Sequence, residues 1–251
     1  MQTMIIAHRG ASKQAPENTL PAFDLAWQAG AEGIETDVQL TKDHVPVLIH
    51  DERINRTTNG SGYVKDYTFN ELKQFDAGGW FDKSFSGTGI ISLDDFLNWL
   101  SDKPLYLNLE LKNNKIEYKD LEVIVVEHLN HYRILNDTTL SSFNPHSIER
   151  LNQMNPEIDT ALLVSKKRGA DVVQKAHSIG AKSLHIKYKF LTPALAAQCR
   201  QKNIALRVFT VNSSRRMAHC FQTACTGIFT DLPDKALQFR HVFNNHAPRH
   251  H

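Results

Sequence analysis

The stretch GIETDVQLTKDHVPVLIHD, at residues 33–51, decides how the strands of this chain can be arranged. Only TKDH, at residues 41–44, separates its two apolar strand patterns. Parallel neighbours require a crossover of about a dozen or more residues, so the second pattern must return antiparallel, as a hairpin. With TKDH as the turn, Leu40 pairs with Val45, and this register places His50 beside Glu35.

Eight strand patterns remain once VPVLIHD is set aside, and they alternate with amphipathic helical stretches, as parallel strands with helical crossovers do. Eight parallel strands close a TIM barrel, and 251 residues suffice for one such domain. The predicted fold class is therefore α/β, a TIM (β/α)8 barrel that covers residues 1–251 as a single domain. The patterns are MIIAH at 4–8, GIETDV at 33–38, LYLNLELK at 105–112, TTLSSF at 138–143, DTALLV at 159–164, SLHIK at 183–187, ALRVFTV at 205–211 and GIFTD at 227–231.

The connection between the hairpin and the strand at 105–112 is oversized. Only its last part, SLDDFLNWL, predicts a helix, with Ser92 as N-cap and Asp95 three residues later. The rest, about residues 51–91, is predicted to be a small insertion over one barrel end. The tail HVFNNHAPRHH, at 241–251, is predicted to be disordered. Further helices are expected at 18–30, 117–130, 146–154, 169–179, 192–202 and 213–223.

The charges of the chain are nearly balanced, with 29 Lys and Arg against 27 Asp and Glu, and they are interspersed along the sequence. This pattern argues against a nucleic-acid partner. No stretch reaches the roughly 20 apolar residues of a membrane span, and the first strand begins by Met4, which leaves no room for a signal peptide. We therefore expect a cytoplasmic protein without a membrane span. The pattern indicates no particular oligomeric state.

Acidic residues stand inside two strand patterns, although parallel strands are normally apolar on both faces. Glu35 and Asp37 are two residues apart and share one strand face. In LYLNLELK the leucines form an unbroken face toward the helices, so Glu110 and Lys112 point into the barrel. Buried charges need compensating partners. These four side chains are therefore expected to meet.

The same polar residues end their strands, as do His8 and Arg9 in MIIAHRG. Active sites of TIM barrels form at the C-terminal ends of the strands, so we expect these groups and His50 to converge there. A buried salt-bridge network in a catalytically silent barrel is the structural alternative, but so much unproductive buried charge is costly.

Three carboxylates with few bases between them suit a hard divalent cation, Mg²⁺ or Ca²⁺. A zinc site built from His8, His50 and one carboxylate ranks behind, because it would use both acid/base groups as ligands. Arg9 and Lys112 beside a cation form a positive cradle for phosphate, and two imidazoles can move protons at neutral pH. Together these parts predict phosphodiester cleavage.

These residues lie within a longer series of motifs that resembles the glycerophosphodiester phosphodiesterase family, of the PLC-like phosphodiesterase superfamily. The series covers residues 4–240 in the family's order, and the ordered combination is highly specific. Its members are HRGAS at 8–12, PENT at 16–19, ETD at 35–37, HD at 50–51, RTTNGSG at 56–62, ELK at 110–112, LSSFNP at 140–145, FTVN at 209–212 and GIFTDLP at 227–233.

The resemblance implies a hydrolase of glycerol and lipid metabolism that converts substrates such as glycerophosphocholine or glycerophosphoethanolamine to sn-glycerol 3-phosphate and an alcohol. Related enzymes can pass through a cyclic phosphate. The resemblance leaves the preferred alcohol and the cation open. It implies that His8 and His50 are the general acid/base pair, that Glu35, Asp37 and Glu110 bind the cation, and that Arg9 and Lys112 contact phosphate.

The chain departs from the family pattern at Phe209, where tryptophan is usual, and at Ile91, where proline is usual. Phe209 could alter the apolar wall around the substrate. Glu17 and Asn18 could support the catalytic groups by hydrogen bonds, although Asn18 could equally cap the helix that follows it.

Two other functions compete with this prediction. The first is a lysophospholipase D or another phospholipase acting on acylated substrates, which would need an exposed apolar entrance. The second is a non-catalytic barrel that binds phosphodiesters or another protein, against which the complete set of polar residues argues.

Overall fold

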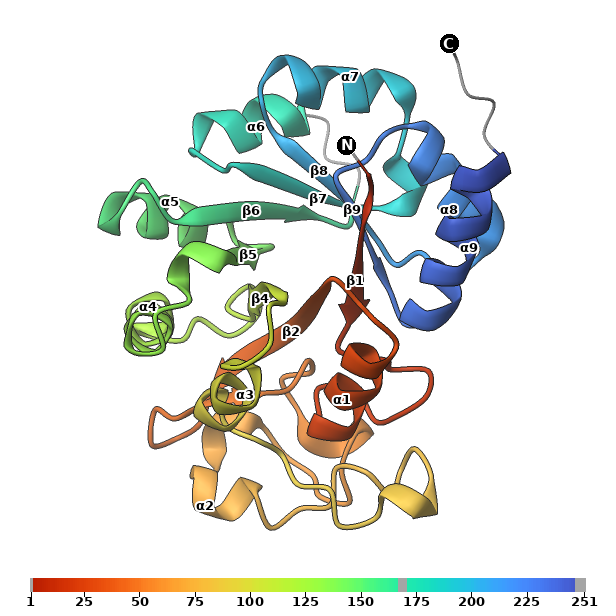
Figure 1. Ribbon diagram of the computed structural model, residues 1–251. Coiled ribbons are helices and arrows are strands. Elements are labelled where there is room, and N and C mark those ends of the chain that lie inside the picture. The colour runs from red at the N-terminus through yellow and green to blue at the C-terminus, as the bar shows by residue number, and fades with distance from the viewer. Residues whose placement is uncertain (1, 167–170, 247–251) are drawn as a thin grey trace.

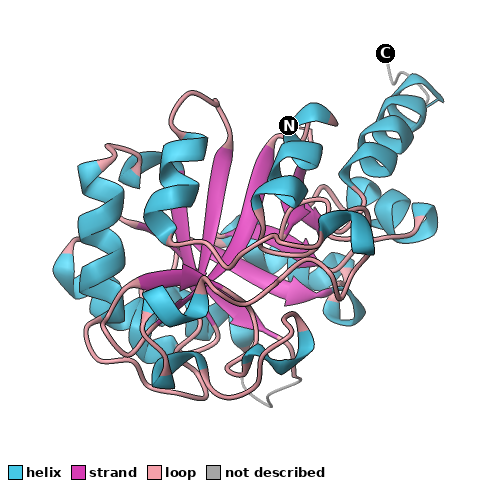
Figure 2. Ribbon diagram, turned by 90° about the horizontal axis from the view of Figure 1, so that it is seen from below, coloured by secondary structure: helices cyan, strands magenta, loops and turns pink. Residues whose placement is uncertain are grey.

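The computed structural model describes residues 2–166 and 171–246 and confirms the TIM barrel. Eight parallel strands form a closed ring, because β1 pairs with both β9 and β2. Figure 1 shows the helices arranged around the strands, and Figure 2 shows the same arrangement from below, with the magenta strands inside the cyan helices. The strands are β1 Met4–His8, β2 Gly33–Leu40, β4 Tyr106–Leu111, β5 Thr138–Ser142, β6 Asp159–Val164, β7 Ser183–Lys187, β8 Ala205–Phe209 and β9 Gly227–Thr230 in the ring, with β3 Pro46–Leu48 outside it.

The predicted helices are all present in the described part of the chain, with ends shifted by a few residues. Ser92 begins α3 with the predicted capping box to Asp95, and Thr192 caps α7 through a hydrogen bond from the Leu195 amide. The predicted helix at 169–179 starts partly outside the described residues. The helices are α1 Leu20–Gln28, α2 Phe69–Leu72, α3 Leu93–Leu100, α4 Leu121–His131, α5 Pro145–Met154, α6 Val172–Ser178, α7 Pro193–Gln201, α8 Ser214–Gln222 and α9 Pro233–His246.

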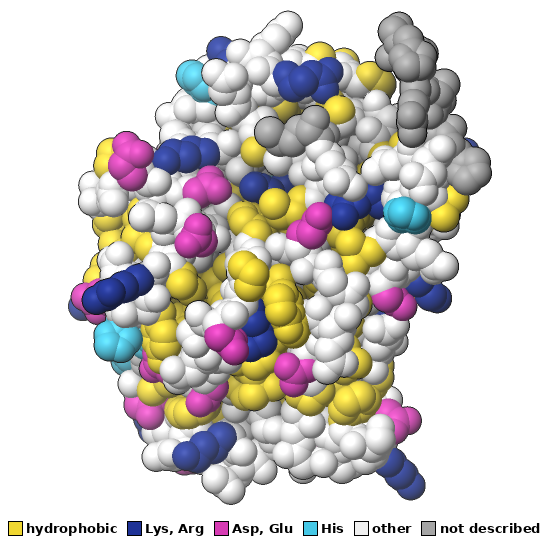
Figure 3. Space-filling model, viewed as in Figure 1, with side chains coloured by type: hydrophobic (Ala, Val, Ile, Leu, Met, Phe, Trp, Pro, Cys, Tyr) yellow, Lys and Arg dark blue, Asp and Glu magenta, His cyan; other side chains and the backbone are white. Residues whose placement is uncertain are grey.

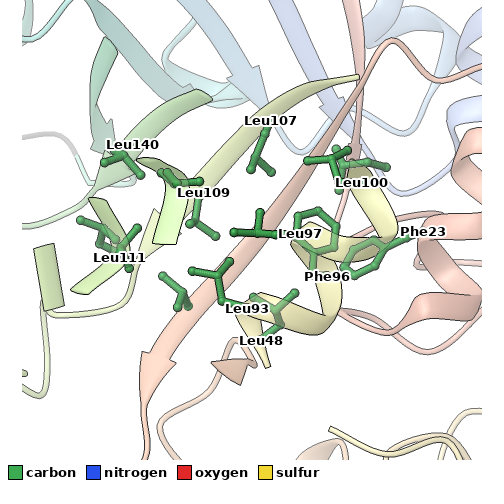
Figure 4. Packing of buried hydrophobic residues seen from close by; sticks show 14 of the residues in the cluster. Phe23, Leu48, Leu93, Phe96, Leu97, Leu100, Leu107, Leu109, Leu111 and Leu140 are labelled. Atoms are coloured by element: carbon green, nitrogen blue, oxygen red, sulfur yellow. The ribbon is translucent and has the colours of Figure 1, made fainter. Parts of the chain in front are cut away.

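The leucine face of β4 packs outward against the helices, as the alternation in LYLNLELK predicts. Leu107, Leu109 and Leu111 are buried in one cluster with side chains of α1 and α3. Figure 4 shows these leucines beside Phe96 and Leu97. The opposite face of β4 points into the barrel, where Asn108 donates to the Ser141 hydroxyl. This alternation is what turns Glu110 inward.

The hairpin is antiparallel as predicted, but its predicted register is wrong by one residue. Leu40 pairs with Pro46, and Val38 pairs with Leu48. The turn contains one more residue than TKDH, because the Thr41 amide donates to the Val45 carbonyl and the Thr41 hydroxyl accepts from the Val45 amide. His50 consequently lies one position away from Glu35 along the hairpin.

The insertion after the hairpin has a small hydrophobic core of its own. Figure 1 shows it as the orange and yellow segment at the bottom. Val47 and Ile49 of the hairpin face this core, while Leu48 between them belongs to the barrel cluster. The hairpin therefore joins the insertion to the barrel. The other buried members of the small core are Ile54, Val64, Leu72, Ala77 and Ile90.

The predicted start of a disordered tail at residue 241 is wrong, because α9 continues to His246. Phe243 packs against Phe221 of α8 with ring centroids 5.4 Å apart, so apolar contact extends the helix. Residues 247–251 of the predicted tail lie outside the described residues.

The visible surface carries charges of both signs. Figure 3 shows Lys and Arg side chains interspersed with Asp and Glu side chains over this face. Among the described residues, no helix combines the length and the apolar character needed to cross a membrane.

Candidate active site

A cavity of about 250 Å³ opens where the C-terminal ends of the barrel strands meet. The predicted residues His8, Arg9, Glu35, His50 and Glu110 line it. Phe209, the departure from the family pattern, is also in its wall. The remaining lining residues are Asn108, Phe143, Leu163, Ser165, Lys187, Thr210 and Phe229.

Glu35, Asp37 and Glu110 converge as predicted. Each offers a carboxylate oxygen within 4.8 Å of the others, and all three residues are buried. Burial and the nearby Asp37 carboxylate raise the pKa of Glu35 well above its ordinary value. Burial would also raise the pKa of Asp37, but Coulombic interactions with His50 and Arg9 lower it instead. Three carboxylates held this closely repel one another unless a cation lies among them.

The donor set fits a hard cation in a second way. The Oδ1 atom of Asp37 is buried and accepts no hydrogen bond in the described part of the chain. The Lys112 ammonium lies 3.6 Å from it. A buried carboxylate oxygen without a hydrogen-bond donor is suited to ligate a metal ion.

Arg9 and Lys112 surround the acidic cluster in different ways. The Arg9 guanidinium lies 2.8 Å from Glu17 and 3.3 Å from Asp37, and its side chain reaches the cavity wall. The Lys112 ammonium is 2.7 Å from Glu110, and Lys112 is buried behind the wall. A direct contact between Lys112 and phosphate stays a prediction. The contact of Lys112 that is present in the structure is the ion pair with Glu110.

Tight packing of the loop after β1 fixes the positions of His8 and Arg9. Gly10 has a positive φ of 81°, and a Cβ there would lie 2.6 Å from the Ala22 backbone. Only glycine fits so close to α1 in this conformation. The Arg9 amide donates to a Glu35 carboxylate oxygen at 2.9 Å, which ties this loop to β2.

His8 is oriented by Asp231, which follows β9. The Nδ1 atom of His8 lies 2.7 Å from Asp231 Oδ1, and the Nε2 atom of His8 lies 4.0 Å from Glu35 Oε2. The Asn212 amide donates to the other Asp231 oxygen at 2.6 Å. Burial would raise the pKa of Asp231, but hydrogen bonding to His8 lowers it to about 2. His8 therefore turns Nε2 toward the acidic cluster.

His50 is oriented by Asp51 and by the buried amide of Gln39. Its Nδ1 atom lies 2.6 Å from Asp51 Oδ1. The Gln39 amide donates to the backbone carbonyls of residues 49, 50 and 51 at 3.0, 3.1 and 2.7 Å. Arg56 of the insertion bridges Asp51 and Glu17 through ion pairs of 2.6 and 2.7 Å. The His50 support thus spans the hairpin, the insertion and the first βα loop.

Asn18 supports the acidic cluster instead of capping α1. Its amide nitrogen donates to Asp37 at 3.0 Å, and its amide oxygen accepts from Thr36 at 2.8 Å. Thr19 is the N-cap residue of α1. Of the two alternatives for Asn18, the supporting contact is the one present.

The sequence interpretation missed Asp51, Asp231 and Gln39 as members of the site. The two aspartates were part of the HD and GIFTDLP motifs, but neither motif assigned them a role in the site. Gln39 gave no signal, because it follows the acidic residues on a strand expected to be apolar. Lys187 was also missed, although it ends a strand pattern as the other site residues do.

Comparison with known proteins gives a consistent result. Residues 8–235 match the glycerophosphoryl diester phosphodiesterase family. A glycerophosphodiester phosphodiesterase from Caldanaerobacter subterraneus subsp. tengcongensis is 38% identical over 93% of this chain and 96% of its own length. Another from Bacillus altitudinis is 38% identical over 95% of this chain and 98% of its own length. An Oleispira antarctica phosphodiesterase, solved in complex with the product sn-glycerol-3-phosphate, has a TM-score of 0.88 and 30% identity over 95% of this chain and 96% of its own.

Proposed function

Since this chain belongs to the glycerophosphoryl diester phosphodiesterase family and is a phosphodiesterase of that kind, we propose that His8 and His50 cleave its substrate by general acid/base catalysis beside a divalent cation held by Glu35, Asp37 and Glu110. The single observation that supports this most is the convergence of both imidazoles and the buried acidic cluster on one cavity. The products are sn-glycerol 3-phosphate and an alcohol, as the ligand of the Oleispira antarctica relative suggests.

The proposed cation is Mg²⁺ or Ca²⁺, because its ligands are carboxylate oxygens. When bound, such an ion neutralises charge that develops on the phosphate oxygens. Lys112 holds Glu110 in place through its 2.7 Å ion pair, and Asn18 does the same for Asp37 through its 3.0 Å hydrogen bond. Both contacts fix the direction in which the ligands point.

The two histidines divide the proton transfers of the reaction. One Nε2 accepts a proton from the attacking water as its oxygen bonds to phosphorus, and the other imidazole donates a proton to the leaving alkoxide as its bond to phosphorus breaks. Both rings have Nδ1 engaged by a carboxylate, Asp231 for His8 and Asp51 for His50. A carboxylate at Nδ1 stabilises the positive ring that forms when Nε2 takes up a proton.

Arg9 is the proposed phosphate contact. It is the cavity-lining guanidinium beside the acidic cluster, and its pKa is raised by Asp37 and Glu17 even though burial opposes this. It therefore stays charged at every pH at which the enzyme is folded. A fixed guanidinium can form paired hydrogen bonds to phosphate oxygens.

The direct test measures release of sn-glycerol 3-phosphate from a panel of glycerophosphodiesters after chelation and after Mg²⁺, Ca²⁺ or Zn²⁺ is added back. Release restored by Mg²⁺ or Ca²⁺ supports the proposed site, whereas restoration by Zn²⁺ alone supports the alternative zinc site. Release only from acylated substrates would favour the lysophospholipase D alternative.

The acid/base roles are tested by His8→Ala and His50→Ala, each expected to lower kcat at least about a hundredfold. The exposed His146 of α5, which pairs with Glu149 outside the cavity, provides a matched control as His146→Ala. Full turnover in either cavity variant, with the barrel intact by circular dichroism, would contradict the assignment.

A further inference from the structure

Lys187 is a charged residue of the cavity wall that the proposed chemistry does not use. It ends β7, and strand register pairs it with Phe209 of β8. Two residues earlier, His185 faces the barrel interior and packs on Phe229, so Lys187 lies on the same inward face. Its side chain is exposed and, in the described part of the chain, has no ion pair or hydrogen bond. The ammonium is therefore available to a ligand.

The cavity is divided by charge and chemistry into two halves. The half on β1, β2, β4 and the hairpin carries His8, His50 and the carboxylates Glu35 and Glu110. The half on β5 to β9 has an apolar wall with two hydroxyl groups, and Lys187 is its charged residue among the described lining residues. The phosphate must lie beside the first half, where the reacting groups are. One of its two ester substituents then extends over the second half.

An adjoining hollow of about 390 Å³ continues the second half outward. It shares Phe143, Leu163 and Ser165 with the cavity. Its charged lining residues, among those described, are Lys166 and Lys175, and Lys175 lies 3.6 Å from Glu149 on α5. The hollow that leads away from the phosphate is therefore lined by positive charges. Among the described lining residues of this half, no carboxylate is present to bind a cationic group.

We propose that Lys187 determines substrate specificity by selecting a leaving alcohol that bears hydroxyl or anionic groups over one that bears a fixed positive charge. This inference rests on the proposed function. The ammonium can donate three hydrogen bonds to hydroxyl or carboxylate oxygens of the alcohol. It repels a quaternary ammonium such as that of choline.

The aromatic side chains nearby offer the strongest argument for the opposite preference. Phe143 and Phe209 lie edge to face, with centroids 6.1 Å apart, and such a corner could hold a quaternary ammonium by cation–π attraction. Aromatic pockets for such groups lose their advantage when another cation lies in the same corner. Lys187 pairs directly with Phe209 across β7 and β8, which places its charge there.

The test compares kcat/KM for glycerophosphoglycerol, whose alcohol is an uncharged polyol, with kcat/KM for glycerophosphocholine. The variants are Lys187→Met, which removes the charge at similar length, and Lys187→Glu, which reverses it. The wild-type ratio is expected to favour glycerophosphoglycerol. It should fall about fivefold in Lys187→Met and about 25-fold in Lys187→Glu, as expected for one and two units of charge near a partly solvated cation.

Lys189→Met is the matched control, because Lys189 is exposed two residues later and packs over Phe190 instead of lining the cavity. It should leave the ratio unchanged, which separates a local contact from a change in net charge. Equal losses for both substrates in Lys187→Met would show that Lys187 contacts phosphate and would overturn the inference, as would an unchanged ratio. No release from either substrate by the wild type would overturn the proposed function as well.

Discussion

Replacing Asp231 by Asn would test how the barrel sets the protonation of His8. The substitution keeps the shape of the side chain but replaces one carboxylate oxygen, an acceptor, by an amide nitrogen, a donor. In the wild type, one Asp231 oxygen faces His8 Nδ1 at 2.7 Å and the other accepts from the Asn212 amide at 2.6 Å. The new amide nitrogen must therefore face either His8 or the Asn212 donor.

Asn212 cannot turn to accommodate the change without losing other bonds. Its amide oxygen already accepts from the Asp231 backbone amide at 2.9 Å and from the Thr230 hydroxyl at 3.1 Å. The amide nitrogen of the variant will thus face His8. Nδ1 must then act as an acceptor, and the proton of the neutral ring moves to Nε2, the atom that faces the acidic cluster.

A ring protonated on Nε2 cannot accept a proton there. We expect Asp231→Asn to lower kcat by a factor on the order of a hundred to ten thousand, the range seen when the carboxylate that orients a catalytic histidine is replaced. The assay is steady-state release of sn-glycerol 3-phosphate at saturating metal and substrate.

The control variant is Ser12→Ala, which removes the 3.2 Å hydrogen bond from the Ser12 hydroxyl to the same Asp231 oxygen and its 2.8 Å hydrogen bond to the His8 backbone carbonyl. It should change kcat by less than about threefold, because the His8 contact remains. Asp231→Asn with more than about a third of the wild-type kcat, and an unchanged barrel by circular dichroism, would refute the reasoning.

Three further predictions follow from the site and the core. Glu110→Gln should raise the dissociation constant for Mg²⁺ or Ca²⁺ at least about tenfold by calorimetry, whereas Glu149→Gln on α5 should not. The pKa of Asp231 is lowered from 3.8 to about 2, so the folded state gains stability above about pH 4 and loses it as the pH falls toward 2. Urea unfolding should accordingly show wild type about 2 kcal/mol more stable than Asp231→Asn at pH 6, with the difference shrinking at pH 3. Leu97→Ala should lower the free energy of unfolding by about 2–5 kcal/mol, since Leu97 of α3 is fully buried in the cluster that contains the β4 leucines, whereas exposed Met154→Ala should cost far less.

Strand periodicity was enough to predict the barrel and the direction of its acidic side chains. The leucine alternation of residues 105–112 fixes which face of β4 turns inward, and a two-residue spacing does the same for Glu35 and Asp37. Spacing alone could not fix the hairpin register, because the Thr41 hydroxyl closes a turn one residue longer than TKDH. The hydrogen bonds between Thr41 and Val45 therefore set a register that the apolar pattern did not predict.

The partners of the two histidines were harder to predict for different reasons. Asp231 is 223 positions from His8, and only closure of the ring between β1 and β9 brings them together. Asp51 is adjacent to His50 in sequence, but adjacency does not predict a side-chain contact. The burial of Lys112 behind Glu110 likewise depends on the packing of β4 against β2, which residue types alone do not determine.

The hairpin gives the enzyme two levels of resistance to denaturation. His8 ends β1, which pairs with β2 on one side and with β9 on the other. His50 instead follows β3, whose Val47 belongs to the insertion's small core. Small cores open locally at lower cost than a whole domain. Opening of the insertion would remove the Arg56 ion pair from Asp51 and loosen the support of His50 while the barrel stays folded, so catalysis would weaken at a lower urea concentration than the one that unfolds the helices.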